Sequence, residues 1–231
     1  MEQVQALPAA SGAKGETRVE EPTRAERTIA RRAAEVRATV PDLELGAEID
    51  MTACVALAAV RACSTTAIVT RACALALREV PRANGAYRDG RFELYSRVNI
   101  GVVMEVDDGF VVPTVLDADG KTLEQLSDEL ELLSDRARSG LLTPPELANA
   151  TFTMTDLGTY GVDRPGTIIT GGQAAALAAG AVREVPVVRD AAIVSGHVMS
   201  VTLVSDHRII SGARAATFLA RIRSFLEAAA L

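Results

Sequence analysis

The 231-residue sequence predicts an α/β protein. Several stretches carry apolar residues three and four positions apart, which is typical of amphipathic helices. Others are short apolar or alternating runs bounded by glycine or proline, which is typical of β-strands. A chain of this length holds one good-sized core or two small ones. We place residues 23–231 in a single domain and expect residues 1–22, which lack periodicity, to form a flexible tail.

The first half of the chain predicts helices and strands in alternation. Thr23–Glu26 forms a capping box, so a helix is expected to begin there. Residues 43–49 alternate between apolar and polar, which predicts a strand with one solvent-exposed face. Asp50 is expected to cap a second helix, and a third should begin at residue 65 or 66. Strands are then expected around residues 91–95, 98–106 and 110–115, the last two joined by a hairpin at 107–109.

The second half predicts two long helices around a run of strands. Leucines recur on one face of residues 122–139, and the many charges there are expected to form a solvated face. Thr143–Glu146 is a second capping box. A final helix should run from about Ser211 to the C-terminus. Between these helices, strands are expected at residues 151–155, 167–170, 173–179, 181–188 and 199–205.

The composition argues against several kinds of partner. A net charge of −6 and a pI near 5.1 disfavour nucleic acid and anionic membranes. Aromatic residues make up 3% of the chain and tryptophan is absent, so a base-stacking surface is not expected. No apolar run is long enough to span a bilayer and no secretory signal is seen, so we expect a cytoplasmic protein. The three cysteines form no CxxC pair and fit reduced core thiols.

No metal site is expected either. The chain has two histidines, and no cluster of His, Cys and Asp has the spacing of metal ligands. His197 follows Ser195 and Gly196, so it is expected on an exposed turn, with a structural or solvent-facing side chain.

Val201–Gly212 is the most informative stretch. An apolar run that predicts a buried strand is followed by Asp206, His207 and Arg208, and then by the start of the last helix. An imidazole at the end of a buried strand would be held by rigid elements on both sides. Because histidine titrates near neutral pH, His207 could act as a general base. The alternative is a structural histidine at a strand end.

The stretch Asp206-His-Arg-x-x-Ser-Gly212 resembles the active-site signature of the dihydrolipoamide acyltransferases, the core subunits of 2-oxoacid dehydrogenase complexes. That signature reads Asp-His-Arg-x-x-Asp-Gly in most members, and chloramphenicol acetyltransferase shares a looser form. The resemblance implies a chloramphenicol acetyltransferase-like α/β fold, a two-layer sandwich with a central mixed sheet and flanking helices. It also implies trimers with each active site between neighbouring subunits. Other segments resemble the family in the same order: 27–32, 98–102, 112–113, 151–158 and 173–177.

The resemblance also assigns chemical roles. His207 would be the base that activates the attacking group. The family places a serine hydroxyl in a Thr-Ile-Ser segment to stabilise the oxyanion, and Thr155 stands at that position and keeps the hydroxyl. Thr153 and Asp156 are its neighbours. The alternative for Thr155 is an ordinary β-branched strand residue.

Ser211 is the main departure from the family, which has Asp there. That Asp is expected to pair with an arginine of the first helix, here Arg31 or Arg32, whereas serine supplies no charge. Two outcomes are possible. Either His207 still acts as the base, with its ring oriented by its own backbone, or the site is impaired. Asp206 and Arg208 are expected to support His207.

Three functions follow as hypotheses. The first is a stand-alone, trimeric acetyltransferase that uses acetyl-CoA and a small hydroxylated acceptor, as in relatives that acetylate the hydroxymethyl group of tetronate intermediates. The second is the catalytic core of a 2-oxoacid dehydrogenase complex, which takes acyl groups from dihydrolipoamide. The third is a non-catalytic assembly protein with a decayed site. No lipoyl attachment is expected in this chain, because Lys14 lacks the surroundings of a lipoyl domain.

Overall fold

The computed structural model describes residue 15 and residues 17–106 and 109–231. The predicted tail falls mostly outside these residues, and so do two of the three residues in the predicted hairpin at 107–109. The helices are α1 (Arg24–Thr39), α2 (Thr52–Arg61), α3 (Thr65–Glu79), α4 (Leu123–Arg138) and α5 (Gly212–Glu227), with short 3-10 turns η1 (Pro81–Ala83), η2 (Ala118–Gly120), η3 (Pro144–Leu147) and η4 (Gly158–Tyr160). The strands are β1 (Asp42–Asp50), β2 (Gly85–Arg88), β3 (Arg91–Leu94), β4 (Ile100–Val106), β5 (Gly109–Val111), β6 (Thr114–Val115), β7 (Phe152–Asp156), β8 (Ala175–Ala179), β9 (Arg183–Arg189) and β10 (Ala192–Asp206).

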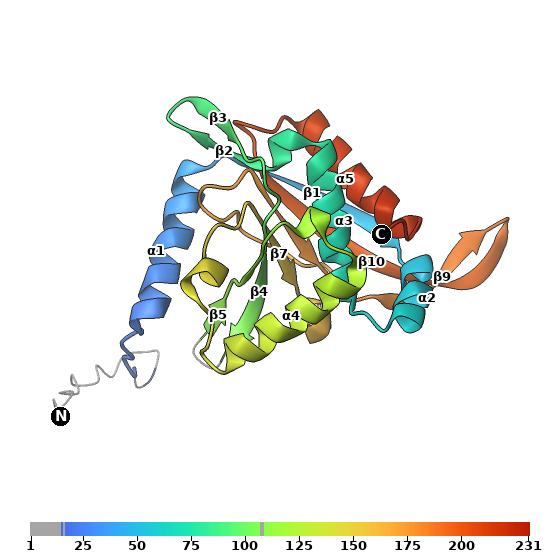
Figure 1. The fold of residues 1–231 in the computed structure, drawn as a ribbon, viewed down its shortest axis with the longest axis horizontal. Coiled ribbons are helices and arrows are strands. Elements are labelled where there is room, and N and C mark those ends of the chain that lie inside the picture. Colours follow the sequence, from blue (N-terminus) through green and yellow to red (C-terminus); the bar gives the residue numbers. More distant parts are fainter. Residues whose placement is uncertain (1–14, 16, 107–108) are drawn as a thin grey trace.

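One mixed sheet organises the fold (Figure 1). Its strands follow the order β1-β10-β8-β7-β4-β5, while β6 pairs with β4 and β9 pairs with β10. The central strands β4, β7 and β8 run parallel to one another, and the other pairs are antiparallel. Strands β2 and β3 form a separate hairpin. The predicted α/β class with a mixed central sheet is confirmed.

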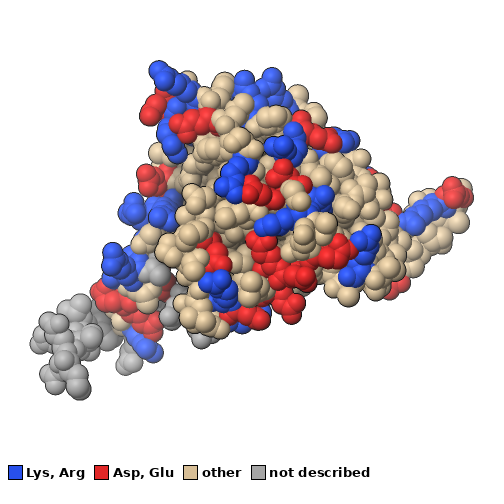
Figure 2. Space-filling view, in the orientation of Figure 1, with Lys and Arg blue, Asp and Glu red and all other residues tan. Residues whose placement is uncertain are grey.

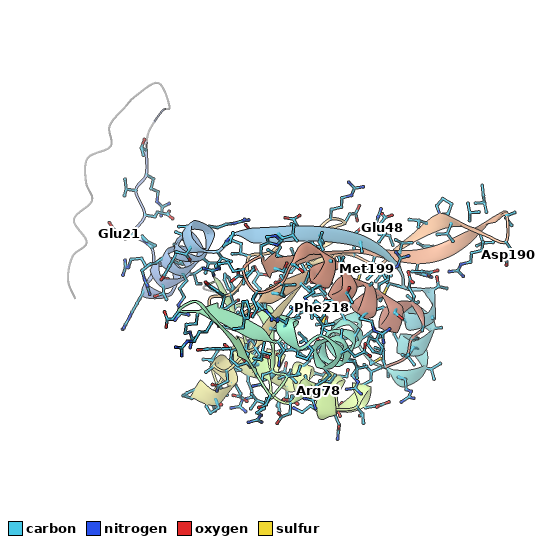
Figure 3. The ribbon with its side chains drawn as sticks, turned by 90° about the horizontal axis from the view of Figure 1, so that it is seen from above. Glu21, Glu48, Arg78, Asp190, Met199 and Phe218 are labelled. Atoms are coloured by element: carbon cyan, nitrogen blue, oxygen red, sulfur yellow. The ribbon has the colours of Figure 1, made fainter. Side chains whose placement is uncertain are left out.

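Helices α3 and α5 cover one face of the sheet (Figure 3). Alternate residues of β1 point to this face, so Ile49 is fully buried, while Glu48 on the other face is exposed. Phe218 of α5 is fully buried and meets the ring of Phe152 on β7 edge to face, with 5.8 Å between ring centres. This aromatic pair joins the helix layer to the centre of the sheet.

Replacing Phe218 with alanine is expected to lower the free energy of unfolding by about 3–5 kcal/mol, because it leaves a cavity between α5 and β7. Urea unfolding followed by circular dichroism measures the loss. A loss below about 1 kcal/mol would mean that α5 is not part of the cooperative core.

The predicted capping boxes are present at Thr23, with Glu26, and at Thr143, although the second opens a 3-10 turn of four residues. The four leucines of α4 that were predicted to face inward are all buried, whereas a fifth, Leu132, is exposed. Acidic side chains gather on the outer face around α4 in Figure 2, so the charges of this helix form the solvated face that was predicted. The acidic residues of α4 are Glu124, Asp128, Glu129, Glu131 and Asp135.

Several predictions about local structure were wrong. Residues 167–170 form no strand, because Thr167 and Thr170 turn their hydroxyls toward threonines of β7 and the loop is broken by Gly171 and Gly172. His197 is not on an exposed turn. It lies half-buried inside β10, which begins at Ala192 and continues the β9 hairpin.

The cap of α2 also differs from the prediction. Met51, not Asp50, is the N-cap of α2, although an oxygen of Asp50 accepts a bond of 2.9 Å from the backbone N of Thr52. The predicted start of α3 at residue 65 or 66 is confirmed, since α3 begins at Thr65 and the side chain of Ser64 caps it. Strand β2 was not predicted at all, since its four residues have no clear alternation.

The three cysteines are buried and free. Burial raises the pKa of the Cys54 thiol to about 11, and it raises the pKa of Cys73 further. These thiols stay neutral and serve as core residues.

Among the described residues, no single helix is long and apolar enough to cross a membrane. Helices α2 and α3 meet that test only as a pair, and they are bent by 113° at their junction.

Candidate active site

The turn that carries His207 begins where β10 ends. The backbone oxygen of Asp206 accepts hydrogen bonds from the backbone N of Ile209 (3.1 Å) and of Ile210 (2.9 Å), whose side chains are buried. The backbone N of His207 donates to the oxygen of Pro41 at 2.9 Å. The side chain of His207 is exposed. The turn therefore fixes the backbone of His207 and leaves its imidazole open to a ligand.

Asp206 and Arg208 flank His207 and bind each other. Arg208 donates from Nε to Oδ1 of Asp206 (2.9 Å) and from Nη2 to Oδ2 (2.8 Å), and its backbone N also donates to Oδ1 (3.0 Å). The carboxylate is 3% exposed. Its hydrogen bonds raise the pKa of Arg208. The supporting role that the sequence suggested for this pair thus has a structural basis.

Sequence reasoning missed Tyr87, whose ring lies 4.7 Å from the guanidinium carbon of Arg208. No motif surrounds Tyr87, and its contact with the turn depends on the position of the β2–β3 hairpin. It also missed Gln173, which accepts a bond of 2.8 Å from the hydroxyl of Thr153 and donates to the oxygen of Ala150 at 3.0 Å.

Thr155 lies near the end of β7 and is half-buried. It shares one face of the strand with Thr153, opposite the core residue Met154. Its hydroxyl is 3.5 Å from that of Thr167, and the hydroxyl of Thr153 is 3.1 Å from that of Thr170. A row of hydroxyls therefore joins β7 to the loop that follows it, and the hydroxyl of Thr155 has one distant partner.

Asp156 points to the other face and holds local structure. It accepts a bond of 2.6 Å from the hydroxyl of Thr66 at the start of α3, and one of 2.9 Å from the backbone N of Gly158. A cavity of about 770 Å³ opens beside it, at the carboxyl ends of the parallel strands β4 and β7. The cavity is bounded by α3, α4 and η4, and Glu105, Glu131 and Arg138 also line it.

Within one chain, Thr155 and His207 lie far apart. Thr155 pairs with Ala178 of β8, and Ala178 pairs with Thr202 of β10. His207 lies five positions after Thr202, one residue beyond the end of β10. With a strand spacing near 4.8 Å and a rise of about 3.3 Å per residue, their Cα atoms are separated by roughly 15–20 Å. The two side chains of one subunit therefore cannot act on the same atom.

The structure does not join Ser211 to the arginines of the first helix. Ser211 is the exposed N-cap of α5, and its side chain makes no capping bond. Arg31 forms an exposed contact of 3.7 Å with Glu35, and Arg32 is exposed. Among the described residues, no group of His, Cys, Asp and Glu side chains could hold a metal ion.

Comparisons with known proteins agree with this geometry. Residues 14–231 match the family of 2-oxoacid dehydrogenases acyltransferase (catalytic domain). The dihydrolipoyllysine-residue acetyltransferase component of the pyruvate dehydrogenase complex of Rickettsia bellii is 31% identical over 168 residues, which cover 73% of this chain and 40% of that protein. The chain thus spans well under half the length of this curated relative.

Solved structures show the same relationship. The dihydrolipoamide acetyltransferase of Azotobacter vinelandii has a TM-score of 0.88 at 28% identity, with 97% of each chain covered. It served to study the catalytic roles of a serine, a histidine 52 residues later and an asparagine four residues beyond the histidine. The cubic core of a pyruvate dehydrogenase multienzyme complex has the same TM-score, identity and coverage. A chloramphenicol acetyltransferase, at 15% identity and a TM-score of 0.56, shows the expected fold. The chain therefore belongs to the family of acyltransferase catalytic domains of 2-oxoacid dehydrogenases.

Proposed function

We propose that this domain transfers acyl groups between CoA and a dihydrolipoyl thiol, with His207 as general base and Thr155 as oxyanion donor. One observation carries the proposal: Thr155 precedes His207 by 52 residues, the spacing of the serine and histidine studied in the Azotobacter acetyltransferase. Both residues also lie at strand ends of the same fold. Ser211, four residues after His207, stands where that protein has an asparagine.

The proposed chemistry needs a base and a donor. The imidazole of His207 takes the proton of the attacking thiol, and the resulting thiolate attacks the acyl carbon of the thioester. The carbonyl oxygen becomes an oxyanion, which the hydroxyl of Thr155 stabilises by donating a hydrogen bond. Collapse of the tetrahedral intermediate breaks the original C–S bond, and the imidazolium returns the proton to the departing thiolate.

The two residues would meet between neighbouring subunits. Their separation of roughly 15–20 Å within a chain means that His207 of one subunit must act with Thr155 of another. A homotrimer, alone or within a larger threefold assembly, is the simplest arrangement that supplies both residues to each site.

The relatives support a thiol acceptor better than a hydroxyl acceptor. The Rickettsia and Azotobacter proteins are both named for dihydrolipoyl chemistry. No residue of this chain identifies a tetronate intermediate, which was the first expectation from the sequence. That substrate is therefore tested as an alternative.

Release of the CoA thiol from acetyl-CoA tests the proposal. We expect release that depends on dihydrolipoamide and that does not occur with hydroxyl acceptors alone. Release that requires a hydroxyl acceptor would favour the O-acetyltransferase instead. Absence of release with every acceptor, from a folded protein of trimer size or larger in light scattering, would favour the non-catalytic assembly protein.

Replacing Ser211 with aspartate is expected to raise the free energy of unfolding by about 0.5–1 kcal/mol. A carboxylate can accept a capping bond that Ser211 does not accept, and its charge is favourable at the N-terminus of a long helix. Urea unfolding at pH 7 measures the gain. The same variant tests for a decayed site, because a large gain in acyl transfer would show that Ser211 had impaired it.

A further inference from the structure

A tyrosine outside every sequence motif contacts the turn that carries His207. Tyr87 lies on β2, and its ring centre is 4.7 Å from the guanidinium carbon of Arg208. Arg208 in turn holds the carboxylate of Asp206 through two side-chain bonds of 2.9 and 2.8 Å. The contacts therefore run from the β2–β3 hairpin to both residues that flank His207.

The ring of Tyr87 shields the Asp206–Arg208 ion pair, which water would otherwise separate. The carboxylate of Asp206 is 3% exposed, whereas the side chain of Arg208 is 32% exposed. Water can reach the guanidinium from its open side and compete for its donors. Tyr87 covers one face of the guanidinium and adds a cation–π attraction. The buried carboxylate thus keeps its partner, and the turn keeps its shape.

The hairpin is itself fixed to the body of the protein. Asn84, at its base, is buried and donates to the backbone oxygens of Tyr95 (2.9 Å) and Arg97 (2.8 Å). The hydroxyl of Tyr95 donates to the oxygen of Gly172, beside β8, at 3.0 Å. The hairpin that carries Tyr87 is therefore held in place, so the tyrosine ring keeps a fixed position against Arg208.

We propose that Tyr87 is a positioning residue for His207, acting through Arg208 and Asp206. The proposal rests on the proposed function, in which His207 is the base. With the ring absent, Arg208 and Asp206 separate more often, and the imidazole loses its alignment with the attacking thiol. Small misplacements of a catalytic group lower the rate steeply, whereas substrate binding elsewhere in the site is unaffected. The loss should therefore fall on kcat and not on KM.

The test compares three variants of the full chain. Tyr87→Ala removes the ring, and Tyr87→Phe keeps it without the hydroxyl. Phe225→Ala is the matched control, because the ring of Phe225 lies 5.1 Å from the guanidinium carbon of Arg221, which pairs with Glu79, near the end of α5 that is far from the His207 turn. We expect Tyr87→Ala to lower kcat about tenfold to a hundredfold. KM should stay the same for acetyl-CoA and dihydrolipoamide, and Tyr87→Phe and Phe225→Ala should keep the kcat of the wild type.

Histidine NMR gives a second readout that does not require activity. The chain has two histidines, so labelled imidazoles give two sets of signals, and the set lost in His207→Ala belongs to His207. We expect Tyr87→Ala to shift or broaden the His207 signals and Phe225→Ala to leave them unchanged. If Tyr87→Ala does not fold, Tyr87→Leu replaces it.

Three results would overturn the proposal: an equal loss of kcat in Phe225→Ala, failure of Tyr87→Phe to restore kcat, or unchanged His207 signals in Tyr87→Ala. If the wild type transfers to no acceptor, the proposed function fails, and the NMR comparison alone decides whether Tyr87 positions His207.

Discussion

Replacement of His207 with alanine is expected to lower kcat for acyl transfer by about 10²–10⁴, the usual contribution of a general base. A thiol is mostly protonated at neutral pH, so without the imidazole little thiolate is available to attack the thioester. The fold should not change, because the side chain is exposed and the turn is held by backbone bonds and by the Asp206–Arg208 pair. Steady-state release of the CoA thiol measures the loss.

His197 provides the control for this experiment, since it is the other histidine of the chain. It lies inside β10, where its backbone N donates to the hydroxyl of Thr52 and its backbone oxygen accepts from Met51. Replacement by glutamine keeps both bonds, so kcat should stay within about twofold of the wild type. A His207→Ala variant that retained more than a tenth of the wild-type kcat would rule out His207 as the base.

Elements with strong local signals could be predicted from the sequence. Helix α4 has a capping box at Thr122 and four buried leucines, and α5 buries Phe218 and its neighbours at helical spacing. The end of β10 at Asp206 could also be predicted, because a run of buried apolar residues stops there. In each case the pattern lies within one helix or strand, where the spacing of residues in the sequence fixes which side chains share a face.

Features that depend on distant pairing could not be predicted. The loop that contains Thr167 and Thr170 looks like a strand because threonine favours strands, but its hydroxyls bind β7. The contact between Tyr87 and Arg208 depends on where the hairpin packs. The separation of Thr155 from His207 follows from the register of β7, β8 and β10, which no local pattern specifies.

That separation leads to a prediction about mixed subunits. His207→Ala and Thr155→Ala should each be nearly inactive as pure proteins, because every site lacks one of its two groups. When the two variants assemble together, a site is intact if His207 comes from a Thr155→Ala subunit and Thr155 comes from a His207→Ala neighbour. Random assembly of equal amounts into trimers gives intact groups in about one quarter of the sites.

The experiment co-expresses the two variants with different tags and purifies assemblies that carry both. Selection for both tags leaves only mixed trimers, each of which has one intact site in three, so recovery toward a third of the wild-type kcat would establish that each site takes its base and its oxyanion donor from different subunits. A matched control combines His207→Ala with the double variant His207→Ala/Thr155→Ala, which supplies no base and should stay inactive. If mixed assemblies of the two single variants stayed as inactive as the pure proteins, the two residues would not act in one site. Thr155 would then be a structural residue of β7, since its distance from His207 within one subunit leaves no other way for both to reach the same thioester.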